Sequence, residues 1–114
     1  MEVTTRSESQ YFIIRVSGEL DANSAIQLDE ELSKAIEERH PKILIDGNEL
    51  KYISSPGIGV FTSKIEDCKQ NNISLVIYGL NETVANVFKI LGLDQILSIA
   101  PDINAAKTLA NDVR

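Results

Sequence analysis

Apolar residues recur along this chain with two different spacings, and the change from one to the other divides it into strands and helices. Short runs that predict β-strands lie at residues 3–7, 11–17, 42–46, 73–78 and 95–99, and all of them except 3–7 are largely apolar. Elsewhere, apolar residues three or four positions apart predict helices with one buried face. The predicted order is β-β-α-β-α-β-α-β-α, which is typical of an α/β fold with a mixed β-sheet covered by helices.

Four helical stripes support this prediction. The apolar positions that we expect to face the core are Ala25, Leu28, Leu32, Ala35 and Ile36; Ile58, Phe61, Ile65 and Cys68; Val84, Val87, Phe88 and Leu91; and Ile103, Ala106, Ala110 and Val113. The acidic residues of the first helix are expected on its solvated face, and they are Asp29, Glu30, Glu31, Glu37 and Glu38. The run at 73–78 is nearly all apolar, which indicates a strand covered on both faces.

Capping residues indicate where these helices begin and end. The first helix has three candidate N-caps: Ser24, which opens a capping-box sequence, or Asp21 or Asn23 a few residues earlier. Asn81 is the expected cap of the third helix, and Gly92 is well placed as the residue after its last turn.

The start of the second helix is the most unusual stretch of the sequence. Pro56 has no N–H to lose and suits the first helical position, which makes Ser55 the expected N-cap. Gly57 and Gly59 follow within the first turns, where each costs about 1 kcal/mol relative to alanine. Glycines in such places are expected where a neighbouring backbone, a partner or a ligand comes close.

A helix N-terminus also favours anions, because it carries partial positive charge and unpaired N–H donors. A phosphoryl group on Ser55 would add about −1.5 to −2 charges there without melting the fold, and would change mainly the outer surface. This stretch therefore has the properties of a phosphorylation switch, although the same residues also make an ordinary, well-formed helix start.

Length and composition narrow the possible classes of protein. We expect the 114 residues to form one domain, 1–114, because 43% hydrophobic and 25% charged residues are typical of a globular protein. A net charge of −6 argues against nucleic-acid binding. The single Cys68 cannot form an internal disulfide, which favours a reducing compartment. With no charged-then-apolar leader after Met1 and no run near the ~20 apolar residues of a membrane span, we expect a cytoplasmic protein without membrane insertion.

The sequence lacks the residue patterns of the common catalytic and cofactor sites. It has no paired Cys and His spacing for zinc, no glycine-rich phosphate loop with a lysine, and no nucleophile elbow. Its only histidine, His40, lies beside a proline in a connecting loop. A phospho-accepting aspartate domain would need an acidic pair as well, and Asp46 is the lone candidate. We therefore expect no enzymatic activity, no cofactor and no metal.

Two segments resemble the STAS domain of bacterial anti-sigma-factor antagonists. The first is Gly-Glu-Leu-Asp at residues 18–21 after the second strand, and the second is Ile-Ser-Ser-Pro-Gly-Ile-Gly at residues 53–59, which opens the second helix. The order of strands and helices agrees over essentially the whole chain, and Leu-Gly-Leu at 91–93 is also similar. The pair of segments is fairly specific, whereas either one alone would be a weak signal.

The resemblance implies a protein that switches partners. In this family the unmodified domain binds an anti-sigma factor that is also a serine kinase, and phosphorylation of a serine at the helix start releases it until a serine phosphatase resets the domain. By this resemblance Ser55 is the phosphorylated residue, with Ser54 as the second choice. The expected partner-binding residues are Asp21, Asn23, Ser54, Gly57 and Ile58.

The chain departs from the family motif at two positions. Ser54 replaces an aspartate before the phosphorylated serine, and Pro56 replaces a serine or threonine after it. These departures favour one alternative to the switch: a binding module that is not phosphorylated, in another regulatory complex or as a subunit of a transport system. The Gly-Ile-Gly turn at the helix start is the signal for a second alternative, an enzyme or nucleotide-binding domain in its own right.

Overall fold

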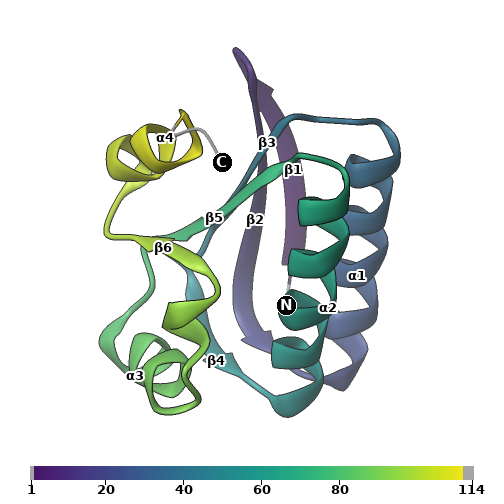
Figure 1. Ribbon diagram of the computed structural model, residues 1–114. Helices are drawn as coiled ribbons and strands as arrows, with labels where there is room; N and C mark the ends of the chain where they lie inside the picture. The colour runs from purple at the N-terminus through teal and green to yellow at the C-terminus, as the bar shows by residue number, and fades with distance from the viewer. Residues whose placement is uncertain (1, 112–114) are drawn as a thin grey trace.

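A computed structural model describes residues 2–111 of the chain, which fold into one six-stranded sheet with helices on its faces (Figure 1). The strands are β1 (Glu2–Glu8), β2 (Tyr11–Leu20), β3 (Lys42–Asp46), β4 (Leu50–Ile53), β5 (Ser74–Tyr78) and β6 (Ser98–Ala100). The helices are α1 (Ala22–Glu37), α2 (Ser55–Gln70), α3 (Glu82–Ile90), the short 3₁₀ helix η1 (Leu93–Gln95) and α4 (Ile103–Asn111).

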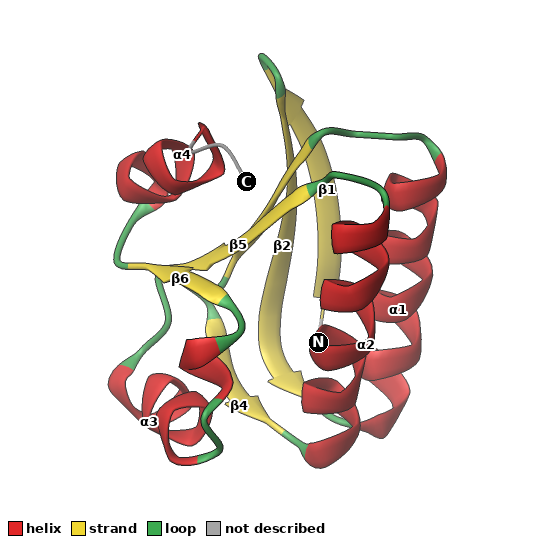
Figure 2. Cartoon of the chain, in the orientation of Figure 1, coloured by secondary structure: helices red, strands yellow, loops and turns green. Residues whose placement is uncertain are grey.

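The main sheet has the order β1-β2-β3-β5-β6. β1 runs antiparallel to β2, and all the other neighbours are parallel. β4 lies outside this order and pairs in parallel with the last residues of β2. Figure 2 shows α1 and α2 side by side to the right of the sheet in the view, with α3 and α4 to its left. Val84 and Phe88 of α3 belong to the same core as α1 and α2, whereas α4 covers the other face.

The sheet separates two apolar cores, and β5 explains why its sequence is apolar throughout. Leu75 and Ile77 point into the larger core with α1 and α2, whereas Val76 and Tyr78 point into the smaller core with α4. Successive residues of a strand face opposite sides, so a strand covered on both sides needs apolar residues at every position. The predicted α/β fold with a mixed, helix-covered sheet is confirmed.

β4 was not predicted from the sequence, and β2 ends three residues later than predicted. Residues 18–20 were expected to leave the sheet, but they continue β2 and pair with β4, with a shift of register between Gly18 and Glu19. β4 escaped detection because it is only four residues long and its two central residues, Lys51 and Tyr52, are exposed. Its strand signal was therefore too short and too mixed to recognise. The last strand is also later and shorter than expected, at Ser98–Ala100, because η1 occupies part of the predicted run.

Most of the expected helix boundaries and stripes agree with the structure. Asp21, one of the three candidates, is the N-cap of α1, and Asn81 caps α3 by accepting a hydrogen bond from the Val84 N–H at 2.8 Å. Gly92 has the left-handed backbone conformation, with φ 74°, that was expected after α3. Leu91 is an error, because the helix ends before it and its side chain is 55% exposed. Val113 lies outside the described residues.

Lys64 is a buried cation that ties α2 to α1. Its Nζ lies 2.8 Å from the Ser33 hydroxyl and 3.2 Å from Asp29 on α1, and 3.6 Å from Asp67 on its own helix. Asp29 was expected on a solvated face, but this contact places it at the seam between the two helices.

No helix among the described residues is both long and apolar enough to cross a membrane.

The first turn of α2 packs tightly on the end of β2, and Gly57 makes this possible. A Cβ atom at Gly57 would lie 2.7 Å from Cγ of Leu20 and 3.1 Å from Cγ1 of Ile53, and both of these side chains are buried. Nothing lies within 4 Å of the same position at Gly59. Close packing against Leu20 and Ile53 therefore explains the glycine at position 57, and it does not explain Gly59.

We expect Gly57→Ala to lower the free energy of unfolding by about 1–3 kcal/mol, since the added methyl group overpacks a closed contact. Gly59→Ala is the matched control on the same helix, and it should be neutral or stabilise the fold by up to about 1 kcal/mol. Chemical denaturation followed by circular dichroism measures both. Equal effects of the two substitutions would contradict this account of the packing.

Candidate functional site

One end of the sheet brings together the start of α1 and the start of α2. β2 and β4 end side by side, with Leu20 opposite Ile53, and each strand leads directly into a helix. Figure 2 shows both helices beginning at the lower end of the view. Because helix N-termini carry partial positive charge, this end of the molecule concentrates two such charges at the surface.

Ser54 fixes the start of α2 to the end of β2. Its backbone N–H and its hydroxyl both donate to the carbonyl oxygen of Leu20, at 2.9 and 2.8 Å. Its hydroxyl oxygen accepts a hydrogen bond from the Gly57 N–H at 3.4 Å and so caps the helix. The predicted N-cap, Ser55, is wrong by one residue: Ser54 is the cap, and Pro56 occupies the second helical position rather than the first.

Ser55 is the first residue of α2, and its side chain is exposed. Within residues 2–111 its hydroxyl makes no hydrogen bond. The Ser54 hydroxyl, in contrast, donates one hydrogen bond and accepts another. Pro56 follows it without an N–H, which leaves fewer backbone donors near the hydroxyl than at an ordinary helix start. Ser55 is therefore the more accessible hydroxyl of the two adjacent serines.

Asp21 supplies a negative charge at the same end of the sheet. Its Oδ1 accepts hydrogen bonds from the backbone N–H of Ser24 at 3.0 Å and from the Ser24 hydroxyl at 2.8 Å. These hydrogen bonds from Ser24 hold the pKa of the Asp21 carboxyl below its usual value, so the group is ionised at neutral pH. Asp21, Asn23 and Gln27 lie along a shallow depression with Ser24 at the start of α1.

The five residues expected to bind a partner differ in exposure. Asp21 and Asn23 are exposed, Ser54 and Ile58 are half-buried, and Gly57 is buried against Leu20. The structure thus gives a packing reason for Gly57, and its contact with a partner remains a prediction. All five lie at the N-caps or on the first turns of α1 and α2.

Two large apolar residues near this end were missed from the sequence. Ile26, in the first turns of α1, is 61% exposed, and Tyr52, two residues before the α2 cap, is 54% exposed. Ile26 lies outside the apolar stripe of its helix, and this position could have predicted its exposure from the sequence. An exposed isoleucine and tyrosine beside a polar site are typical of contacts made by a binding partner.

Other residues considered for chemistry have structural roles. Asp46 is buried, and its Oδ1 accepts hydrogen bonds from the backbone and side chain of Asn48 at 3.0 and 2.9 Å. The His40 ring stacks on Phe12 with centroids 4.2 Å apart, and its Nε2 lies 3.2 Å from Oε1 of Glu38. Among residues 2–111, no three His, Cys, Asp or Glu side chains come close enough to hold a metal ion.

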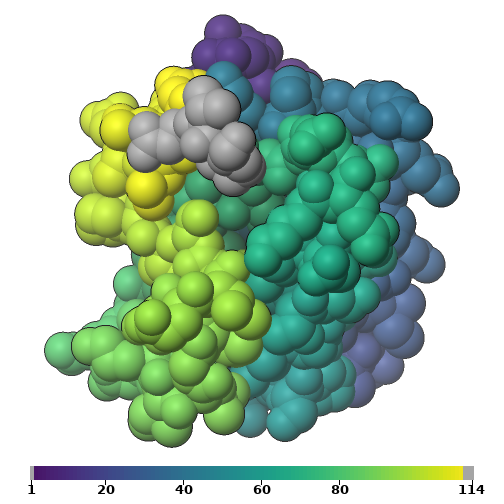
Figure 3. All heavy atoms as spheres, viewed as in Figure 1, coloured from purple at the N-terminus to yellow at the C-terminus, as the bar shows by residue number. Residues whose placement is uncertain are grey.

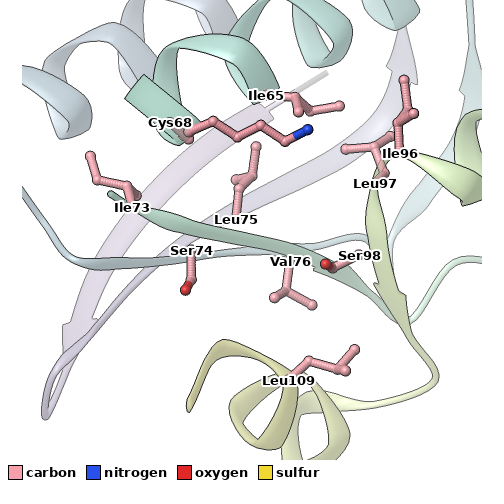
Figure 4. A pocket seen from close by; sticks show the side chains of 11 residues that line it. Ile65, Cys68, Ile73, Ser74, Leu75, Val76, Ile96, Leu97, Ser98 and Leu109 are labelled. Atoms are coloured by element: carbon pink, nitrogen blue, oxygen red, sulfur yellow. The ribbon is translucent and has the colours of Figure 1, made fainter. Parts of the chain in front are cut away.

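A separate hollow lies at the β5–β6 side of the sheet. Figure 3 shows α2 and the yellow-green segment around β6 on the same face, and Figure 4 shows the hollow of about 300 Å³ beside them. It is lined mainly by apolar side chains, including Ile65, Ile73 and Leu97, together with Cys68. Burial raises the pKa of the Cys68 thiol to about 11, so it stays protonated and unreactive at neutral pH. None of the expected site residues lines this hollow.

Comparison with known proteins identifies the family of this chain. The sequence model of the STAS domain matches residues 2–106. This chain belongs to the STAS domain family. A protein named anti-sigma-B factor antagonist, from Listeria monocytogenes serovar 1/2a, is 32% identical to it over 92 residues, which cover 81% of either chain.

Solved structures agree with this STAS fold. An anti-sigma factor antagonist from Mycobacterium paratuberculosis has a TM-score of 0.84 at 20% identity, covering 97% of this chain and 94% of the other. The Bacillus cell fate determinant SpoIIAA in its phosphorylated form has a TM-score of 0.73 at 20% identity, covering 95% of this chain and 99% of the other.

The two adjacent serines of this STAS domain should respond differently to truncation. Ser54→Ala removes the helix cap and the hydrogen bond to Leu20, so we expect the free energy of unfolding to fall by about 1–2 kcal/mol. Ser55→Ala is the matched control and should change it by less than about 0.5 kcal/mol, as for an exposed side chain without partners. Urea denaturation of the two variants measures the difference. A larger loss of unfolding free energy for Ser55→Ala than for Ser54→Ala would show that Ser55, and not Ser54, caps the helix.

Proposed function

We propose that this STAS domain is an anti-sigma factor antagonist that acts by partner switching in the cytoplasm. The unphosphorylated domain binds an anti-sigma factor of the serine-kinase type, phosphorylation of Ser55 by that kinase releases the complex, and a serine phosphatase restores the binding form. Membership of the family and the names of its relatives support this proposal.

The observation that carries the proposal is the position of the Ser55 hydroxyl. It is exposed at the first position of α2, and within the described residues it makes no hydrogen bond that a phosphoryl group would have to break. The neighbouring Ser54 hydroxyl is engaged with Leu20 and Gly57, so its modification would release the helix cap. We therefore assign the phosphorylation to Ser55 and not to Ser54.

The proposed binding surface surrounds this hydroxyl. Asp21 and Asn23 at the start of α1 and Ile58 on α2 supply its polar and apolar edges. Ile26 and Tyr52 are the exposed apolar side chains that we add to this surface as its anchors.

Electrostatics explain how one phosphoryl group would release the partner. The group adds about −1.5 to −2 charges at the same end of the sheet as Asp21, which is already ionised. Burying this charge at an interface without new partners costs several kcal/mol, which is enough to reverse a moderate affinity. The fold would tolerate the same charge, because it lies at the positive end of α2.

The second candidate function is a STAS binding module that is not switched, either in another regulatory complex or in a transport system. Pro56 favours it, because the missing N–H removes one of the donors that a phosphoryl group at Ser55 would use. Ser54, which replaces the aspartate of the family motif, also removes a charge beside the acceptor hydroxyl.

The switch is tested by incubating the protein with its kinase-type anti-sigma factor and ATP and locating the phosphate by mass spectrometry. We expect modification of Ser55 in the wild type and in Ser54→Ala, and none in Ser55→Ala. Phosphate on neither serine would remove the switch.

The consequence for binding is tested separately. Ser55→Asp should weaken binding of the anti-sigma factor at least tenfold in calorimetric titration, because it places a charge at the centre of the interface. Ser63→Asp, an exposed position later on α2, changes the net charge equally and serves as the control. Unchanged affinity for Ser55→Asp would favour the binding module that is not switched.

A further inference from the structure

β1 is an open edge of the sheet. It pairs with β2 on one side, and no strand among residues 2–111 pairs with its other side. Five of its seven residues are exposed, and its register with β2 is unbroken from end to end. Figure 1 shows it at the margin of the sheet, at the opposite end of the strand order from β6.

An edge of this kind requires an explanation. Folded proteins generally protect sheet edges with very short strands, prolines or bulges, because a row of unpaired N–H and C=O groups invites another strand. The opposite edge follows this rule, since β6 has only three residues. β1 has seven residues, no proline, no glycine and no bulge, so it is long and regular enough to pair again.

The charges of β1 select one way for it to pair with a second copy of itself. In an antiparallel pair centred on Thr4, Glu2 lies opposite Arg6 of the other copy, twice, and Thr4 lies opposite its own counterpart. If the pair were centred on Thr5 instead, Glu2 would lie opposite Glu8, twice, which places like charges together. Of these two registers, only the first is complementary.

The side chains of that register are available. Glu2, Thr4 and Arg6 share one face of the strand, because alternate residues point the same way, and all three are exposed. Arg6 lies 3.8 Å from Glu8, a loose surface contact, while Glu8 also pairs with Lys107 on α4. Arg6 also acts on the Tyr78 hydroxyl, so turning to a new carboxylate would exchange two weak contacts for one ion pair, while Glu8 keeps Lys107.

We propose that two copies of this chain associate through the open edge of β1, antiparallel, with a two-fold axis at Thr4. The two sheets then form one continuous sheet, and the closed symmetry prevents further growth. Because the paired strands run in opposite directions, the ends that carry Ser55 point away from each other. Both sites stay accessible, so the association does not depend on the proposed function.

Cross-linking tests the register directly. Thr4→Cys places two thiols opposite each other across the axis, about 4.5–5.5 Å apart between Cα atoms, so mild oxidation or a short bismaleimide should give a covalent dimer. Ser7→Cys is the matched control, because its counterpart lies about 20 Å away in this register. Cys68 does not interfere, since it is buried. Equal cross-linking of the two variants would overturn the register.

Charge exchange tests the complementarity. Sedimentation equilibrium of the wild type should detect a concentration-dependent dimer, and Glu2→Arg or Arg6→Glu alone should raise its dissociation constant at least tenfold. The double variant Glu2→Arg with Arg6→Glu should restore it, while circular dichroism verifies that each variant is folded. A wild-type protein that stays monomeric at every concentration, or a double variant that stays as weak as the single ones, would overturn the proposal.

Discussion

The carbonyl oxygen of Leu20 is the point on which the functional end of this molecule depends. It accepts two hydrogen bonds from Ser54, one from the backbone and one from the hydroxyl. Leu20 is the last residue of β2, and Ser54 is the cap of α2, so the sheet and the helix meet at one atom. The buried Leu20 side chain then fills the space that a side chain at Gly57 would need. Together these contacts fix where α2 begins and which hydroxyl is left at the surface.

This arrangement gives a physical meaning to the departure from the family motif at position 54. An aspartate can cap a helix, but an ionised carboxylate has no proton to donate to a carbonyl oxygen. Ser54 does both, because its hydroxyl donates to Leu20 and accepts from Gly57. The serine is therefore well suited to this contact, and the negative charge at the site comes from Asp21 instead.

The sequence predicted those parts of the fold that repeat. Helical stripes such as Ala25, Leu28, Leu32 and Ala35, and the all-apolar run of β5, are periodic and were read correctly. β4 was missed because its two buried residues, Leu50 and Ile53, are three positions apart and do not follow the two-residue period of a strand. The position of the α2 cap was missed by one residue because it depends on a hydrogen bond to Leu20, 34 positions earlier in the chain. A contact over that distance leaves no local pattern, since proline is compatible with either of the first helical positions.

The pairing of β2 has a mechanical consequence. Its first half pairs with β3, at Tyr11 to Arg15, whereas its last residues, Gly18 to Leu20, pair with β4 after a shift of register. β2 thus changes its neighbour along its length. The hydrogen bonds between β2 and β4, which lead into Ser55, are separate from those between β2 and β3 in the main sheet. Local opening of the short β4 branch would expose its amide protons to solvent exchange without breaking the β3–β5 pairing. A conformational change at this end, as when another molecule binds, can therefore occur without lowering the stability of the rest of the domain.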